Sequence, residues 1–244
     1  MIPSNLPTVS WICPVYRRTA CLPNLIACFL GQDYPPELLN LIILDDGGQY
    51  AAGIAGDRWE VVGIGKRFNS LPAKYNALAG LSGAEILIVA EDDDTYLAWH
   101  TMAHALTIRK APQTLSKPSR VLSDYPGRIV IEGAHGRFHG SVALTRELWA
   151  ARDGWPVTDA PNFDQQMMAR FSQPFPADTT DAATPSYVFR WHTGEPHGQS
   201  FASDPGDFDW YRNAAVCRTE DIVRTIEPKF DELTSQLYRG GVAL

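Results

Sequence analysis

Four consecutive acidic residues are the first candidate for a chemical site. Glu91, Asp92, Asp93 and Asp94 directly follow an apolar run, residues 84–90, that is typical of a buried strand. Carboxylates packed this closely repel one another unless a counter-charge lies near them. Oxygen ligands of this kind suit Mg²⁺ or Mn²⁺, which proteins often share with substrate phosphates. A solvated acidic turn is the alternative, and the acidic run alone favours neither interpretation.

A second group of polar residues surrounds an earlier predicted strand. Asp46 follows the predicted strand 38–44 and precedes two glycines. A carboxylate there can accept hydrogen bonds from a ribose or a base, although Asp and Gly are also common in ordinary turns. Lys74 and Asn76 lie in the first turns of a predicted helix, where a cation opposes the helix dipole. An anionic ligand beside Lys74 would relieve this conflict, and a solvated surface lysine is the alternative.

Histidines and one further carboxylate extend the set of candidate groups. His192 and His197 lie in a polar loop after the last predicted strand, where neutral imidazole is a good ligand for Mn²⁺-type ions. We expect this loop to close over a bound nucleotide. Asp164 begins a predicted helix, where it is either an N-cap or a general base. His100 and His104 are four residues apart on another predicted helix, and we interpret them as surface residues.

The elements that position these residues alternate between strand and helix in the first half of the chain. Such alternation predicts a parallel sheet with helices on both faces. Ligands of open sheets bind outside the carboxyl ends of the strands, which is where the acidic residues lie. The predicted strands are residues 8–13, 38–44, 60–64, 86–90, 121–122, 128–132, 138–144 and 187–191. The predicted helices are one capped by Thr19 and ended by Gly31, then residues 70–81, 97–109, 146–151, 164–171 and a tail from 219.

Composition excludes several classes of protein. The 244 residues are 45% hydrophobic, which suffices for one sizeable core. A net charge of −7 without a run of Lys or Arg disfavours non-specific nucleic-acid binding. We expect no membrane span and no signal peptide, and four cysteines without CxxC spacing indicate reduced thiols in a cytoplasmic protein. The dinucleotide-binding and P-loop glycine patterns are both missing, which disfavours an NAD enzyme or a P-loop enzyme.

Six segments of the chain occur in an order that is known from one enzyme family. They are VSWICPVYRR (9–18), QDYP (32–35) with LIILDDG (41–47), KYNAL (74–78), EDDD (91–94), GSVALTRE (140–147) and DQQMMAR (164–170). In this order, over roughly residues 8–200, they resemble family 2 glycosyltransferases. The acidic segment takes the place of that family's Asp-x-Asp metal motif, GSVALTRE resembles its acceptor-side strand and helix, and DQQMMAR resembles its Glu-Asp-x-x-x-x-x-Arg helix.

The resemblance implies a fold and an activity. The expected fold is α/β, a single GT-A domain with a mostly parallel central sheet flanked by helices. It comprises a nucleotide-sugar-binding half (1–97), an acceptor-binding and catalytic half (98–218) and a C-terminal helical tail (219–244). The implied activity is sugar transfer with inversion from a nucleotide sugar, with UDP as the default nucleotide and Mn²⁺ or Mg²⁺ as the ion. The acceptor stays open among a glycan, a lipid-linked sugar, a protein and a modified nucleic-acid base.

The resemblance also implies roles for individual residues. The expected catalytic base is Asp164. The expected nucleotide-binding residues are Pro14, Tyr16, Arg17, Asp46, Lys74, Asn76 and Asp92. The expected metal ligands are Asp93, as the main one, Glu91 and His197, with His192 as the alternative histidine. Residues 133–140 are expected to border the acceptor.

Three departures from the family pattern keep other functions open. Glu91 replaces an Asp, Lys74 replaces the commoner Arg and gives up its bidentate fork, and Asp164 lacks the usual preceding Glu. A nucleotide-sugar-binding protein without transfer activity is therefore one alternative. A nucleotidyltransferase that forms a nucleoside-diphosphate sugar is another, but the first strand is not followed by a Gly-rich basic loop for a triphosphate.

Overall fold

The computed structural model describes residues 5–18, 21–50, 53–125, 128–134, 136–158, 160, 162–172, 177–178 and 185–190. Its strands are β1 (Val9–Val15), β2 (Leu39–Asp45), β3 (Ile54–Gly56), β4 (Trp59–Gly63), β5 (Ile86–Val89), β6 (Thr95–Tyr96), β7 (Ser116–Lys117), β8 (Arg120–Tyr125), β9 (Arg128–Gly133), β10 (Ala143–Thr145), β11 (Ala177–Asp178) and β12 (Tyr187–Arg190). Its helices are α1 (Leu22–Leu30), α2 (Leu71–Leu81), α3 (His100–Lys110), α4 (Arg146–Ala151) and α5 (Phe163–Phe171), with short 3₁₀ turns η1 (Pro36–Leu38) and η2 (His139–Ser141).

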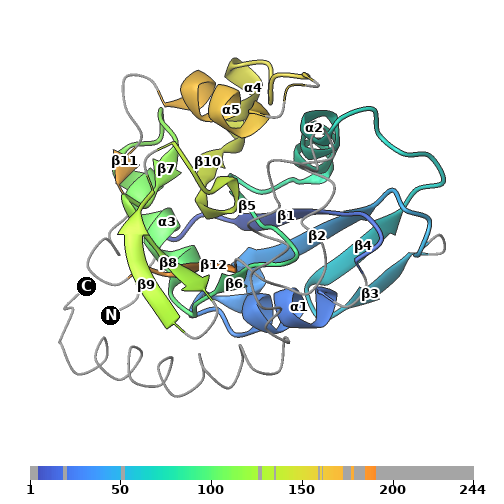
Figure 1. The fold of residues 1–244 in the computed structure, drawn as a ribbon, viewed down its shortest axis with the longest axis horizontal. Helices are drawn as coiled ribbons and strands as arrows, with labels where there is room; N and C mark the ends of the chain where they lie inside the picture. The colour runs from blue at the N-terminus through green and yellow to red at the C-terminus, as the bar shows by residue number, and fades with distance from the viewer. Residues whose placement is uncertain are drawn as a thin grey trace.

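Within these residues the strands form two sheets (Figure 1). The larger has the order β11-β7-β10-β5-β1-β2-β4-β3, and the smaller has the order β6-β12-β8-β9. At the centre of the larger sheet, β1 pairs in parallel with β2 on one side and with β5 on the other. The strand order therefore reverses between β1 and β5. A reversal of this kind opens a crevice at the carboxyl ends of the strands, which is the usual ligand site of open α/β sheets.

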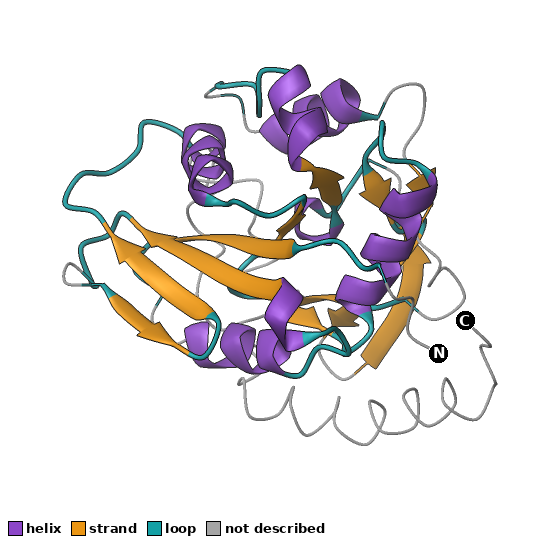
Figure 2. Cartoon of the chain, turned by 180° about the vertical axis from the view of Figure 1, so that it is seen from behind, coloured by secondary structure: helices purple, strands orange, loops and turns teal. Residues whose placement is uncertain are grey.

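The two faces of the larger sheet are covered by different helices (Figures 1 and 2). Alternate residues of a strand point to opposite faces. On one face Trp11 and Cys13 pack in a cluster that includes α1 and residues of α3, and on the other Ile12 packs in a cluster that includes α2, α4 and α5. Helices on both faces explain why the central strands are apolar along their whole length.

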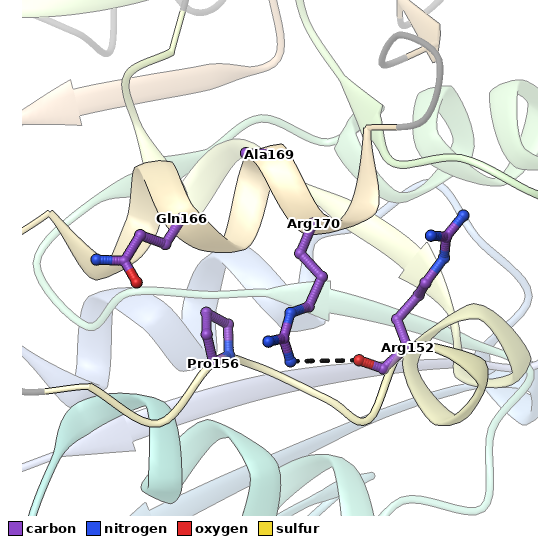
Figure 3. A pocket seen from close by; sticks show the side chains of 5 residues that line it. All are labelled: Arg152, Pro156, Gln166, Ala169 and Arg170. Atoms are coloured by element: carbon purple, nitrogen blue, oxygen red, sulfur yellow. Dashed lines mark hydrogen bonds between the residues drawn. The ribbon is translucent and has the colours of Figure 1, made fainter.

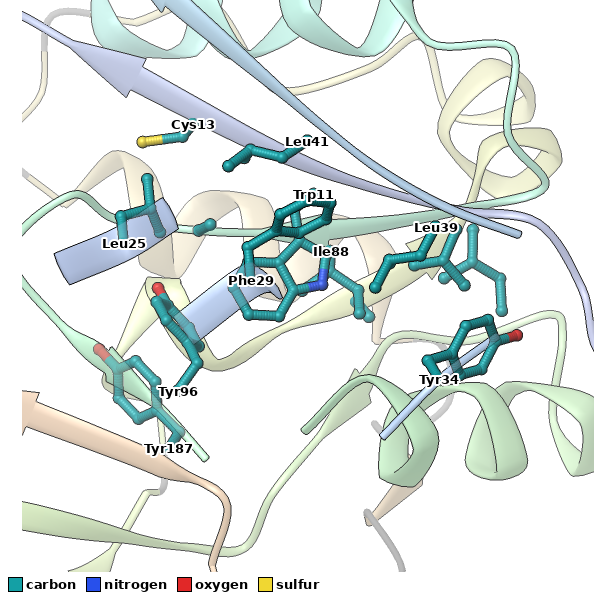
Figure 4. Packing of buried hydrophobic residues seen from close by; sticks show 14 of the residues in the cluster. Trp11, Cys13, Leu25, Phe29, Tyr34, Leu39, Leu41, Ile88, Tyr96 and Tyr187 are labelled. Carbon is teal, nitrogen blue, oxygen red and sulfur yellow. The ribbon is translucent and has the colours of Figure 1, made fainter. Parts of the chain in front are cut away.

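Trp11 occupies the centre of the first cluster (Figure 4). Its ring centroid lies 5.8 Å from that of Phe29 and 4.9 Å from that of Tyr96. The indole Nε1–H donates to Thr101 Oγ1 at 3.1 Å, so the polar atom of this buried side chain is satisfied. Trp11 thereby connects β1 with α1 and α3, the helices on this face of the sheet.

The structure confirms most of the predicted elements of the first half and corrects several details. Gly31 ends α1, and Ser70 caps α2 by accepting the N–H of Ala73 at 3.3 Å, as the sequence indicates. The α1 N-cap is Cys21, and Thr19 lies outside the described residues. The strands β3, β6, β7 and β11 were not predicted, because two or three residues are too few to show alternation.

Two predictions about the second half are wrong. Residues 138–144 do not form one strand, since Phe138 takes a left-handed conformation (φ 63°) that starts the 3₁₀ turn η2, and only the end of this segment enters β10. His100 and His104 are not surface residues but are fully buried in α3. No helix among the described residues is long and apolar enough to cross a membrane. The predicted tail 219–244 lies outside the described residues.

Candidate functional site

The candidate site lies at the carboxyl ends of β1, β2 and β5. Here Arg18, shortly after β1, reaches the acidic residues that follow β5. Its Nη1 lies 2.9 Å from Asp92 Oδ1 and 2.7 Å from Asp93 Oδ2, and both carboxylates are buried. Burial acts to lower the pKa of Arg18, but the two aspartates outweigh it and raise that pKa. Arg18 is thus a counter-charge from within the protein.

Three of the four acidic residues could hold a cation. Carboxylate oxygens of Glu91, Asp93 and Asp94 all lie within 4.8 Å of one another. Asp94 is also tied to the smaller sheet, because its Oδ2 accepts a short hydrogen bond from the hydroxyl of Tyr187 and its Oδ1 accepts the N–H of Arg190 at 3.1 Å. The structure therefore brings the expected ligands Glu91 and Asp93 together and adds Asp94, which the sequence assignment omitted.

The surroundings of Asp92 and Asp94 raise the pKa of both carboxyl groups. Burial and repulsion by Asp93 raise the pKa of Asp92 to about 7, although Arg18 opposes this shift. Burial likewise raises the pKa of Asp94, with Asp93 and Glu91 adding to it. Oδ2 of Asp92 is buried and has no hydrogen-bond partner within the described structure. A buried carboxylate oxygen without a partner is destabilising, so a cation near it would be favourable.

A buried ion pair lies beside this acidic group. Lys74 Nζ is 2.5 Å from Asp46 Oδ1 and also donates to Val15 O at 2.5 Å. The second carboxylate oxygen of Asp46 accepts the N–H of Phe68 at 3.0 Å. Burial lowers the pKa of Lys74, and Asp46 acts against that shift. The anion that relieves Lys74 is therefore a protein carboxylate, and the pair joins the carboxyl ends of β1 and β2.

Asp45, the last residue of β2, shapes the loop that follows. Its fully buried carboxylate accepts N–H groups of Gly47, Gln49 and Tyr50 at 2.8–2.9 Å. Gly47 approaches Arg17 so closely that a Cβ atom at position 47 would lie 3.1 Å from the Arg17 nitrogen. The sequence placed Asp45 only in a strand-end motif, whereas the structure shows that it orders the wall of the site.

The expected nucleotide-binding residues of β1 line the same corner. Pro14 lies in β1 and is half-buried, as is Tyr16 just after it. The guanidinium carbon of Arg67 lies 4.2 Å from the Tyr16 ring centroid, and that of Arg17 lies 5.2 Å from it. Arg17 has a left-handed backbone (φ 57°) and an exposed side chain. Cations therefore gather around one aromatic ring beside the carboxylates.

Asn76 holds a turn of the second half of the chain. Its Oδ1 accepts the N–H of Trp155 at 2.8 Å and Nε1–H of Trp149 at 3.0 Å, and its Nδ2 donates to Trp155 O at 2.9 Å. Gly154, between these tryptophans, has φ 68°, and a Cβ there would lie 2.3 Å from Asn76 Oδ1. Asn76 thus has a structural role, and its contact with a nucleotide stays a prediction.

Arg170 fastens the other side of this turn (Figure 3). Its Nη1 donates to Arg152 O at 3.3 Å and to Gly154 O at 3.2 Å. An open hollow of about 590 Å³ lies between the turn and α5. It is lined by Arg152, Pro156, Gln166, Ala169 and Arg170. Arg170, which ends a segment of the family resemblance, therefore connects α5 to the turn that carries Trp155.

Asp164 lies in the first turn of α5, two residues after the N-cap, which is Asn162. It is partly exposed, and its Oδ1 accepts the N–H of Gln165 at 2.8 Å. It lies close enough to His139 and Lys117 to raise the pKa of each. These two buried residues were not singled out from the sequence. Burial nevertheless lowers the pKa of Lys117 to about 7 and that of His139 to about 4.

His139 lies close both to the acidic group after β5 and to Asp164. Its Nδ1 lies 3.2 Å from Glu91 Oε1, and its Nε2 lies 3.2 Å from Trp155 Nε1. The only hint in the sequence was the expectation that residues 133–140 border the acceptor. The predicted ligands His192 and His197 fall outside the described residues, so their assignment stays a prediction.

Comparison with solved structures identifies the fold. The chain is similar to S. aureus TarS 1–349 in complex with UDP-GlcNAc, with a TM-score of 0.64 at 14% identity over 97% of this chain and 76% of that chain. The mannosyltransferase PcManGT from Pyrobaculum calidifontis, in complex with GDP-Man and Mn²⁺, gives 0.59 at 16% identity over 99% and 77%. Against another structure of S. aureus TarS 1–349 the TM-score is 0.61 at 13% identity, and the match covers 75% of this chain and only 60% of the other.

Sequence comparison adds nothing to this likeness. No protein-family model matches the chain, and no curated protein sequence matches it. Identities of 12–16% carry information about the fold alone. Membership of family 2 therefore remains an expectation from the motifs. The chain has the mixed α/β GT-A fold of these glycosyltransferases, which confirms the fold class predicted from the sequence.

Proposed function

We propose that this protein is a glycosyltransferase that moves a sugar from a nucleotide-sugar donor to an acceptor hydroxyl, with inversion at the anomeric carbon and with Mn²⁺ or Mg²⁺ as its ion. One observation carries the proposal. Glu91, Asp93 and Asp94 converge within 4.8 Å at the carboxyl end of β5, at the point where the strand order reverses. That is where an open α/β sheet binds its ligand.

The residues present fit a divalent ion. The donor set consists of carboxylate oxygens, which Mg²⁺ and Mn²⁺ prefer. Asp92 Oδ2, buried and without a hydrogen-bond partner among the described residues, adds an acceptor that a cation or its bound water could satisfy. An ion held by Glu91, Asp93 and Asp94 would stabilise negative charge on the leaving diphosphate.

The chain's own residues would bind and orient the donor. Arg17 and Arg67 lie around Tyr16, and Arg18, the residue after Arg17, contacts Asp92 and Asp93. Guanidinium groups are suited to binding phosphate oxygens through paired hydrogen bonds. The half-buried Pro14 and Tyr16 would contact the nucleoside, next to Asp46. The complexes of TarS with UDP-GlcNAc and of PcManGT with GDP-Man support a nucleotide-sugar donor, and UDP is the nucleotide that we test first.

Asp164 would act as the general base. It would accept the proton from the acceptor hydroxyl as that oxygen attacks the anomeric carbon and the bond to the diphosphate breaks. The carboxylate is partly exposed, so an acceptor can reach it. Holding donor and acceptor in line would supply much of the rate acceleration.

A thermal-shift panel tests the proposal. Nucleoside diphosphates and nucleotide sugars are added singly, each with and without Mn²⁺. A ligand at one hundred times its dissociation constant stabilises the protein by about 2.7 kcal/mol, which corresponds to an increase in Tm of roughly 5–11 °C for a chain of this size. We expect such an increase for at least one nucleotide sugar, larger with Mn²⁺ than without. Asp93→Asn should abolish the Mn²⁺-dependent part, whereas Asp57→Asn, at an exposed position, should retain it.

Two results would overturn it. The function is wrong if no nucleotide raises the Tm under either condition. If nucleotide sugars raise the Tm equally with and without Mn²⁺, the proposed role of the ion is wrong, whereas the proposed class of donor is retained. Release of nucleoside diphosphate from a stabilising donor then separates an enzyme from a protein that only binds nucleotide sugars.

A further inference from the structure

His139 connects the acidic group to the turn of the second half of the chain. It is almost fully buried in η2, between Glu91 on one side and Trp155 on the other. Both ring nitrogens have a partner within the described structure, each at 3.2 Å. The two contacts together determine which nitrogen carries the proton.

The indole of Trp155 determines the tautomer of this histidine. An indole Nε1–H can only donate a hydrogen bond, so His139 Nε2 must accept it and carry no proton. In a neutral imidazole the single proton then lies on Nδ1, where it is directed at Glu91 Oε1. His139 is therefore a donor to Glu91.

The indole itself is held from several sides. The main-chain N–H and C=O of Trp155 both bond to Asn76. Its ring stacks on Tyr75 with centroids 5.5 Å apart, and Phe171 meets it edge-on at 5.8 Å. Arg170 fixes the preceding carbonyl, that of Gly154. The indole N–H thus has little freedom to point elsewhere.

The turn that carries His139 is equally constrained. Lys117 Nζ donates to Arg137 O at 2.5 Å and to Ser141 Oγ at 3.1 Å. Ser141 Oγ–H donates to Phe138 O at 2.7 Å, and Phe138 has the strained positive φ of 63°. A strained residue persists only where its surroundings over-determine it. The imidazole is consequently fixed at both ends.

Glu91 needs such a fixed partner more than its neighbours do. It is the half-buried member of the acidic group, with 28% of its side chain exposed, whereas Asp93 and Asp94 are buried. A glutamate also has one more rotatable bond than an aspartate, so more of its conformational entropy must be removed to place the carboxylate. Partners hydrogen-bonded to ligating carboxylates orient them, and loss of such a partner typically weakens metal binding 10–100-fold.

We propose that Trp155 and His139 are positioning residues for Glu91: Trp155 selects the Nδ1–H tautomer of His139, and His139 orients the Glu91 carboxylate toward a divalent ion. This assignment rests on the ion of the proposed function. It makes no use of the donor or the acceptor, and its first part needs no ion at all.

The tautomer is tested by long-range ¹H–¹⁵N NMR of the metal-free protein, with the His139 signals identified by their absence in His139→Gln. We expect Nδ1 to be protonated and Nε2 to be unprotonated. Trp155→Phe keeps the ring against Tyr75 but removes the N–H, so the ¹⁵N signal of Nε2, which loses its donor, should shift. Glu91→Gln should preserve the wild-type tautomer, because the donor to Nε2 remains. A protonated Nε2 in the wild type, or no change in Trp155→Phe, would overturn the assignment.

The consequence for the ion is tested by titrating Mn²⁺ without donor and following the free ion by electron paramagnetic resonance. Trp155→Phe and His139→Gln should weaken Mn²⁺ binding by about 10–100-fold. Trp149→Phe is the matched control, because it removes an indole N–H of the neighbouring helix α4 that donates to Asn76 and not to His139, and it should bind Mn²⁺ as the wild type does. Circular dichroism checks that each variant is folded.

The outcomes separate the two proposals. Equal Mn²⁺ affinity for Trp155→Phe and Trp149→Phe overturns the positioning role and leaves the proposed function intact. Absence of Mn²⁺ binding by the wild type overturns the ion of the proposed function and the orientation of Glu91 with it, while the NMR result still decides whether Trp155 selects the tautomer.

Discussion

Lys74 Nζ lies 2.5 Å from Asp46 Oδ1, and about 95% of each side chain is buried. The same ammonium group binds the carbonyl oxygen of Val15 at the end of β1. One cation therefore joins the carboxyl ends of two neighbouring parallel strands directly beneath the candidate site. Its helix, α2, connects β4 to β5 along the chain, so the pair also anchors the connection that leads to the acidic residues.

Replacing Lys74 by Met should strongly destabilise the protein. The change leaves the Asp46 carboxylate buried without its cation, and breaking a buried pair in this way typically costs about 3–5 kcal/mol of unfolding free energy. Urea denaturation measures the loss. Lys66→Met, at an exposed position of the preceding loop, is the control and should stay within about 0.5 kcal/mol of the wild type. Equal stability of the two variants would contradict the structural role of the pair.

Replacing Arg18 by Gln should make the protein more dependent on a divalent ion. Asp92 and Asp93 lose their internal counter-charge, so the metal-free variant should melt about 5–10 °C below the wild type. Added Mn²⁺ should restore part of this loss and therefore raise the Tm of the variant more than that of the wild type. Differential scanning calorimetry with and without Mn²⁺ gives both values. Arg146→Gln, at an exposed position, is the control. An equal effect of Mn²⁺ on the Tm of Arg18→Gln and Arg146→Gln would show that Mn²⁺ does not replace the positive charge of Arg18.

Replacing Asp164 by Asn should abolish most transfer while leaving donor binding unchanged. An amide cannot accept the proton of the acceptor hydroxyl, and loss of a general base typically slows a reaction by about 10²–10⁴-fold. The rate is followed as release of nucleoside diphosphate, and donor binding as the thermal shift. Asp153→Asn is a suitable control, because Asp153 is exposed and Asn tolerates its positive φ of 56°. An undiminished rate in Asp164→Asn would exclude this residue as the base.

Acid should destabilise the protein through two buried histidines of α3. Burial, aided by nearby Lys117, lowers the pKa of His104 from 6.5 to about 3, and burial lowers that of His100 as well. Above pH 6.5 both residues are neutral in the folded and unfolded states, and their contribution to stability is complete. As the pH falls below 6.5, only the unfolded state takes up these protons. Each histidine should then remove about 1.4 kcal/mol of unfolding free energy per pH unit.

Urea denaturation at pH 6.5 and 5.5 measures this loss. His104→Gln should reduce the decrease between the two pH values by the share of one histidine, since the contributions of His100 and of His139, whose pKa burial also lowers, remain. The readout is the difference between the two pH values and not the stability of the variant itself, so any general destabilisation cancels. If the variant and the wild type lose the same free energy between pH 6.5 and 5.5, the histidines do not carry the effect.

The pattern of apolar runs was enough to predict the central strands and the helices that connect them. β1, β2 and β5 are buried along almost their whole length, so almost every residue in them is apolar and each forms an easily recognised apolar run. The short strands β6, β7 and β11 have two residues each and owe their pairing to partners distant in sequence. Local sequence cannot predict such pairing, because its stabilisation comes from contacts that exist only after the chain has folded.

The same division applies to the candidate site. The run from Glu91 to Asp94 and its place after a strand can be read directly from the sequence, as can the turn at Asp46 and the helix start at Lys74. The tertiary structure decided which carboxylates converge. Arg18 forms an ion pair with Asp92, whereas Asp94 accepts a hydrogen bond from Tyr187 and also lies close to Glu91 and Asp93. His139 and Trp155 also belong to the site, although they follow Glu91 by 48 and 64 residues along the chain. Residue types and strand ends are local properties, but the partners of a buried charge depend on which segments pack together, and only the folded chain determines that.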